Sequence, residues 1–84
     1  MNIPVWETGE IEGRAEPGDV IELIENGKVI DSTRAEFDGF FLFEKVRYKK
    51  YKVRSRQQVQ KVEVNRKHPI VQVAWNDVIR VAKK

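Results

Sequence analysis

The dipeptide Asn26–Gly27 separates two short runs in which apolar and polar residues alternate. Both residues tolerate the left-handed backbone conformation of a type I′ turn, which makes this dipeptide a strong local signal for a β-hairpin. The pattern predicts strands over Val20–Glu25 and Lys28–Arg34, on either side of the turn. A second glycine turn, Asp38–Gly39, precedes the most apolar run of the chain, Phe40–Val46. This succession of tight turns and short alternating runs indicates an all-β chain.

The rest of the sequence continues the same pattern. Alternation with a period of two is widespread, and no window of a dozen residues keeps apolar side chains at helical spacing. Further strands are expected over Gly9–Arg14, Tyr51–Arg56, Val59–Val64, Ile70–Trp75 and, after an Asn76–Asp77 turn, Val78–Val81. About seven or eight short strands with regularly spaced turns are typical of a β-sandwich. We therefore predict a single β-sandwich domain over residues 1–84.

Composition and length restrict the class of protein. With 35% charged and 40% apolar residues the chain is neither disordered nor a membrane span, since no apolar stretch approaches about 20 residues. We therefore expect no direct membrane insertion. The segment Met1–Glu7 lacks the basic and apolar regions of a signal peptide. Two alternatives follow: a cytoplasmic protein if the chain is complete, or a piece excised from a larger exported protein, which we favour.

Basic residues gather between Lys45 and Lys67, where Glu63 is the sole acid, although the net charge is only +3. One interpretation is a solvated strand face. The alternative is a small basic β-barrel that binds single-stranded nucleic acid through the Lys45–Lys67 region, with Tyr48 stacking on bases while nearby cations meet phosphates. The residues of that alternative site are Arg47, Tyr48, Lys49, Lys50 and Lys52.

The sequence offers no catalytic or metal-binding constellation. Ser32 and Ser55 lie in presumed strands, and the one histidine, His68, stands beside Pro69, so no Ser-His-Asp arrangement is indicated. Without cysteine, a zinc site built from protein ligands alone is excluded. The oxygen donors Asp31, Glu36 and Asp38 do not have calcium-loop spacing, and Asp38 is expected to serve its own turn. We expect no enzyme activity, no catalytic residues, no cofactor and no metal.

Both faces of one region are apolar. If Phe41 and Phe43 point inward, Phe40 and Leu42 point outward, where a sheet with one solvated face would be polar. Val20 and Ile24 are expected beside them on a neighbouring strand. Such a patch often marks a contact surface, here for a protein partner or a neighbouring domain of a parent chain. Alternatively, another strand or the N-terminal Val5 and Trp6 cover it. The predicted partner-binding residues are Phe40, Leu42, Val20 and Ile24.

Residues 9 to 56 resemble the transthyretin-like, or carboxypeptidase-regulatory-like, family of bacterial surface modules. The family pattern of glycine turns, aromatic strand and tyrosine-x-valine matches Gly9, Ile11, Gly13, Pro17, Gly18, Ile21, Leu23, Asn26, Gly27, Lys28, Asp38, Gly39, Phe41, Phe43, Val46, Tyr51 and Val53. The glycines are expected where the backbone dihedral φ is positive, and Tyr51 is expected to fill the interior and anchor a loop through its hydroxyl. Val46–Lys50 departs from the family, because it replaces a leucine-proline-x-glycine turn with a basic and aromatic connection.

The resemblance implies a Greek-key β-sandwich of transthyretin- or immunoglobulin-like type. Similar domains include the C-terminal domains of outer-membrane pilus ushers and modules of adhesins and surface-layer proteins, which mediate contacts instead of chemistry. It therefore implies a non-catalytic structural or protein-interaction module of a cell-envelope protein, in the periplasm, outer membrane or cell surface.

Overall fold

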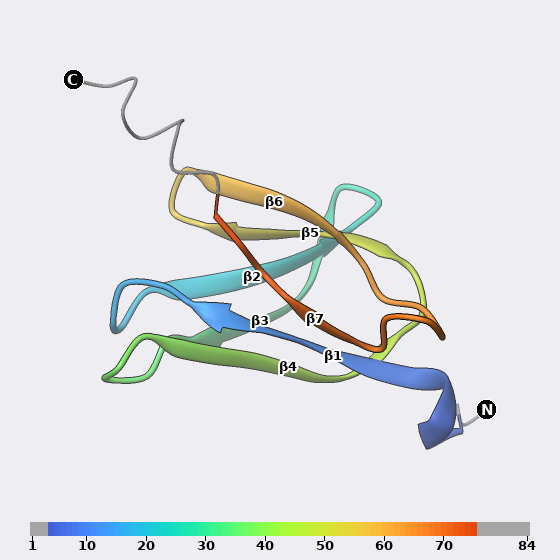
Figure 1. Cartoon of the computed structure of the whole chain (residues 1–84). Coiled ribbons are helices and arrows are strands. Elements are labelled where there is room, and N and C mark those ends of the chain that lie inside the picture. The colour runs from blue at the N-terminus through green and yellow to red at the C-terminus, as the bar shows by residue number, and fades with distance from the viewer. Residues whose placement is uncertain (1–3, 76–84) are drawn as a thin grey trace.

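A computed structural model describes residues 4–75, which form two packed β-sheets (Figure 1). A single 3₁₀ turn, η1 (Val5–Glu7), precedes the first strand. The seven strands of the described residues are β1 (Thr8–Arg14), β2 (Val20–Glu25), β3 (Lys28–Arg34), β4 (Phe40–Arg47), β5 (Lys50–Ser55), β6 (Gln58–Glu63) and β7 (Ile70–Gln72). The prediction of an all-β chain is confirmed. The turn expected at Asn76–Asp77 and the strand expected over Val78–Val81 lie outside the described residues.

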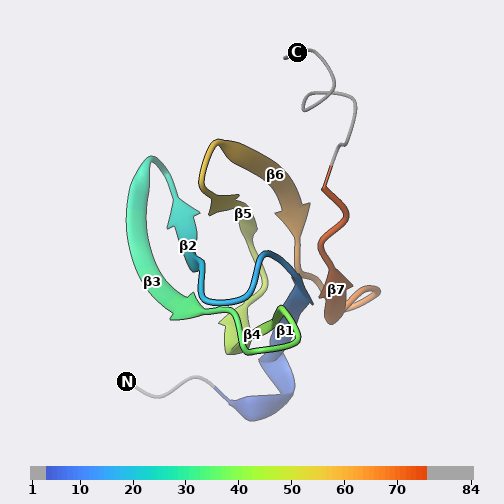
Figure 2. The same ribbon diagram turned by 90° about the vertical axis from the view of Figure 1, so that its left-hand side faces the viewer.

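The two sheets differ in size. One has three strands in the order β4-β1-β7, with β1 antiparallel to β4 and parallel to β7. The other has four strands in the order β3-β2-β5-β6, all antiparallel. The hairpins β2–β3 and β5–β6 stay within the larger sheet. At each of the remaining connections between strands, the chain passes from one sheet to the other (Figure 2).

The turns set the ends of the strands. Asn26 and Gly27 have φ values of 53° and 80°, as a type I′ turn requires, and the strands predicted on either side of them are confirmed. The other predicted strands are found with shifted ends. Strand β5 stops at Ser55 because Arg56, with φ of 57°, begins the turn to β6.

The core lies between the sheets. Its buried side chains are Ile11, Ile21, Leu23, Phe41, Phe43, Val46, Tyr51, Val53, Val64 and Val73. The inward orientation predicted for Phe41 and Phe43 is confirmed, and their rings meet edge to face at 6.2 Å between centroids. Such aromatic pairs add stability beyond the area that they bury.

Gly9 and Gly13 are required for a reason other than the predicted one. Gly18, Gly27 and Gly39 have positive φ, as expected, but Gly9 and Gly13 do not. A Cβ atom on Gly9 would lie 2.0 Å from the carbonyl oxygen of Pro69, and one on Gly13 would lie 2.9 Å from the Phe41 ring. These two glycines therefore permit the close approach of neighbouring groups to β1.

The prediction that β2 and β4 are neighbouring strands is wrong. Phe40 and Leu42 belong to β4 in the three-stranded sheet, whereas Val20 and Ile24 belong to β2 in the four-stranded sheet. Each pair alternates with buried residues of its own strand, so the two pairs face outward from opposite sheets. The sequence could not reveal this, because the chain passes from one sheet to the other between β3 and β4.

Candidate functional site

The residues with catalytic or ligating side chains are dispersed. Ser32 lies exposed on β3, Ser55 is buried at the end of β5, and His68 lies exposed in the loop between β6 and β7. Within residues 4–75, no three His, Cys, Asp or Glu side chains gather in a metal-binding group. Asp38 accepts a 2.9 Å hydrogen bond from the amide of Phe40, which confirms its role in the turn.

The outer face of the three-stranded sheet is partly covered by polar side chains. The guanidinium of Arg14 lies 5.8 Å above the centre of the Phe40 ring, and both Phe40 and Leu42 are half-buried. Trp6 is 73% exposed and therefore covers little, and the side chain of Val5 lies outside the description. This face offers a partner less free apolar surface than the sequence suggested.

The β2–β3 hairpin exposes more aliphatic surface. Val20 lies on its outer face, and Val29 and Ile30 on β3 are each 49% exposed. Strand β3 is an edge strand, and every residue along it except Thr33 is exposed. We call Val20, Val29 and Ile30 the hairpin edge. Of the predicted partner-binding residues, Val20 is part of it, while Ile24 lies on the same face beside Val29 but is buried.

The residues of the predicted nucleic-acid site are divided between two places. Tyr48 packs against the core and its hydroxyl donates a 3.0 Å hydrogen bond to the carbonyl oxygen of Trp6. The ammonium of Lys49 lies 2.8 Å from a carboxylate oxygen of Glu25. Arg47 thus ends β4 and Tyr48 and Lys49 form the connection to β5, whereas Lys50 and Lys52 alternate along β5.

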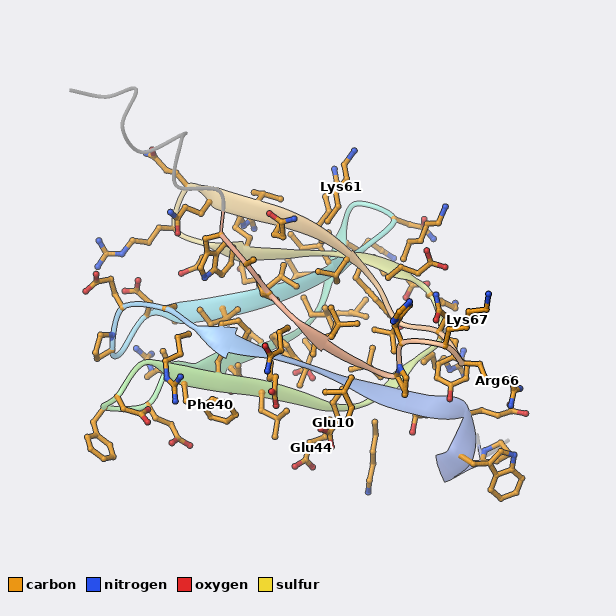
Figure 3. The ribbon with its side chains drawn as sticks, viewed as in Figure 1. Glu10, Phe40, Glu44, Lys61, Arg66 and Lys67 are labelled. Atoms are coloured by element: carbon orange, nitrogen blue, oxygen red, sulfur yellow. The ribbon has the colours of Figure 1, made fainter. Side chains whose placement is uncertain are left out.

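Lys50 and Lys52 line a shallow groove on the outer face of the four-stranded sheet. The groove has a volume of about 480 Å³, and its lining includes Ile24, Lys50, Lys52, Lys61 and Glu63. Lys61 lies directly opposite Lys52 in the β5–β6 pairing, and Lys50 lies opposite Glu63. Figure 3 shows Lys61 on the side of the molecule opposite Phe40. We call this feature the lysine groove.

Lys61 was not among the residues predicted for a site. The signal that could have found it is the turn at Arg56–Gln57, since pairing outward from that turn brings Lys61 opposite Lys52. A hairpin register is fixed once its turn is fixed.

Two side chains, one on β5 and one in the turn that follows it, have shifted pKa values. Burial raises the pKa of the Tyr51 hydroxyl above its ordinary value, and the nearby Glu25 raises it further, while Arg47 lowers it. A hydrogen bond to Asp19 raises the pKa of Arg56. At neutral pH the Tyr51 hydroxyl therefore stays protonated as a donor, and the Arg56 guanidinium stays charged.

Comparison with known family models, with curated proteins and with solved structures gives no significant match for this chain. No helix within residues 4–75 has the length and apolar character to cross a membrane.

Proposed function

We propose that this domain is a non-catalytic interaction module with a transthyretin-like Greek-key arrangement, belonging to a larger exported or cell-envelope bacterial protein. Several of the residues that resemble the family support this proposal, because they have a packing role. Gly9 permits the close approach of the Pro69 carbonyl, and Gly13 permits that of the Phe41 ring. Tyr51 is buried, and its hydroxyl donates a hydrogen bond to the Arg47 carbonyl oxygen.

The hairpin edge is the observation that supports the interaction role. An exposed edge strand presents unpaired backbone groups, and β3 adds exposed aliphatic side chains to them. A partner strand can pair with such an edge through backbone hydrogen bonds while alternate side chains provide specificity. Ile30 is an extra residue in the pairing with β2, which forms a bulge and limits indiscriminate pairing. We therefore expect a specific partner polypeptide at this edge.

The alternative of single-stranded nucleic-acid binding has less support. Its aromatic residue, Tyr48, is engaged by the core and by Trp6, and Lys49 is paired with Glu25. Base stacking needs an accessible aromatic face.

Site-specific photocrosslinking tests the interaction role. A photoreactive residue is introduced at Ile30 of the chain in the cells that produce it, with separate variants at Phe40 and at Lys67. We expect one discrete adduct from Ile30, because β3 would contact the partner, and its loss after Val29→Ser. Purified Val29→Ser should unfold at nearly the wild-type temperature, since Val29 is half exposed.

The control positions separate the possible outcomes. A discrete adduct from Phe40 alone would assign the interface to the three-stranded sheet. Equal labelling from Ile30 and the loop residue Lys67 would indicate random collisions and contradict a specific interface.

A further inference from the structure

We propose that the lysine groove binds an extended acidic peptide segment of a partner protein. This inference goes beyond the proposed function, because it names the chemistry of a ligand. It depends on lysines of β5 and β6, whereas the hairpin edge depends on aliphatic side chains of β2 and β3. The two proposals can therefore fail separately.

The lysines of the groove differ from the neighbouring cations. On the same sheet and at its ends, Arg54 is paired with Glu22, Arg56 with Asp19 and Lys49 with Glu25. In the described part of the chain, Lys50, Lys52 and Lys61 form no ion pair. The groove thus keeps three ammonium groups that form no ion pair, although Lys50 lies opposite Glu63, whereas Arg54, Arg56 and Lys49 are each paired with a carboxylate.

The pairing of Lys52 with Lys61 is unfavourable in the free protein. Like charges directly opposite each other on antiparallel strands repel, because their Cβ atoms lie only about 5 Å apart. Only Glu63 contributes an acid to the groove, and it faces Lys50. An anionic ligand would relieve this repulsion, so binding would be favoured by electrostatics already present in the fold.

The spacing of the lysines fits an extended peptide. Lys50 and Lys52 lie on the same face of one strand, about 6.6 Å apart. Alternate side chains of an extended peptide have this same spacing, so two carboxylates separated by one residue can meet two ammonium groups. The apolar side chain of Ile24 in the groove lining lowers the local dielectric and strengthens those contacts.

The groove lacks the features of a nucleic-acid site. The aromatic residue in its lining, Tyr51, is buried and its hydroxyl is bonded to the Arg47 carbonyl oxygen. Single-stranded nucleic acids need accessible aromatic faces for stacking in addition to cations. Carboxylates on a peptide need only the ammonium groups.

Fluorescence anisotropy with the full chain tests this proposal. The probe is a labelled peptide of about ten residues in which glutamate and serine alternate, and the control peptide has glutamine in place of glutamate. The test variant is Lys52→Gln with Lys61→Gln. Its matched control is Arg66→Gln with Lys67→Gln in the β6–β7 loop, which removes the same charge elsewhere (Figure 3). Circular dichroism melts establish that both variants are folded.

We expect the glutamate peptide to bind, the glutamine peptide not to bind, and the Lys52/Lys61 variant to weaken binding at least about tenfold. The Arg66/Lys67 variant should change the affinity by less than about twofold. Equal weakening by both variants would indicate generic charge attraction and overturn the proposal. Absence of binding up to about 1 mM peptide would also overturn it. A thymidine oligonucleotide that binds more tightly and depends on Lys52 and Lys61 would assign the groove to nucleic acid instead.

Discussion

The hydroxyl of Tyr51 donates a 2.8 Å hydrogen bond to the carbonyl oxygen of Arg47, while its ring is only 5% exposed in the core. The bond ties the connection between β4 and β5 to the interior of the sandwich. This connection is the place where the sequence departs from the family pattern. Tyr51 thus performs the expected anchoring role without the family's leucine-proline-x-glycine turn.

Tyr51→Phe should lower the free energy of unfolding by about 1–2 kcal/mol, because it removes the hydroxyl and leaves a half-buried carbonyl without its partner. Urea denaturation followed by tryptophan fluorescence measures this change. Tyr48→Phe is the matched control, since its hydroxyl bonds the Trp6 carbonyl in a more exposed setting. The control should lose less than about 0.5–1 kcal/mol. A larger loss from Tyr48 would contradict the anchoring role of Tyr51.

Alkaline pH should destabilise the fold partly through the same hydroxyl. Burial holds the pKa of Tyr51 above its ordinary value of 10.0 in the folded protein, so the unfolded chain releases this proton first. Tyr51 therefore contributes stability below pH 10 that is lost as the pH rises through its folded pKa. Urea midpoints measured from pH 8 to pH 12 should fall less steeply for Tyr51→Phe than for wild type. Parallel curves would show that other groups control the alkaline loss.

Gly9→Ala should be among the most damaging small substitutions. A Cβ there would lie 2.0 Å from the Pro69 carbonyl oxygen, so the β6–β7 loop or β1 must shift at a cost of about 2–3 kcal/mol. Gly27→Ala is the comparison, because it adds no steric contact but places a side chain at a φ of 80°. That change should cost about 1–2 kcal/mol. If Gly9→Ala proved the milder of the two in thermal melts, the close approach of Pro69 would be wrong.

Local features of the fold were predictable from the sequence. Which strands lie next to each other in a sheet was harder to predict. Asn26–Gly27 fixes its hairpin because the turn conformation needs those two residues. Alternation identified Phe41 and Phe43 as core because side-chain direction has a period of two. Neither signal reports which sheet a strand joins after a crossing connection, so β2 was wrongly set beside β4. The contacts of Gly9 and the Lys52–Lys61 pair depend on residues brought together only in space.

Lys45→Gly should stabilise the protein. Lys45 lies at a bulge in β4 opposite β1 and has a φ of 57°, a conformation that costs a residue with a side chain about 1–2 kcal/mol. Its exposed side chain forms no ion pair within residues 4–75, so little is lost with it. Part of the gain is offset by the greater entropy of glycine in the unfolded chain, which leaves a net gain of about 0.5–1 kcal/mol. A lower melting temperature in calorimetry would show that the lysine side chain has a structural role.

Lys61→Glu should increase stability and abolish peptide binding together. The substitution converts the like-charged cross-strand pair with Lys52 into an opposite-charged pair, worth about 0.2–1 kcal/mol in an antiparallel sheet. It also places a carboxylate in the lysine groove, where it repels an acidic ligand. Urea denaturation and the anisotropy titration with the glutamate peptide measure the two effects on the same sample. Lys67→Glu, in the β6–β7 loop, makes the same charge change and should leave both quantities near wild type. If Lys61→Glu left the protein less stable, the Lys52–Lys61 pair would not be a site of repulsion, and the electrostatic argument for the groove would fail with it.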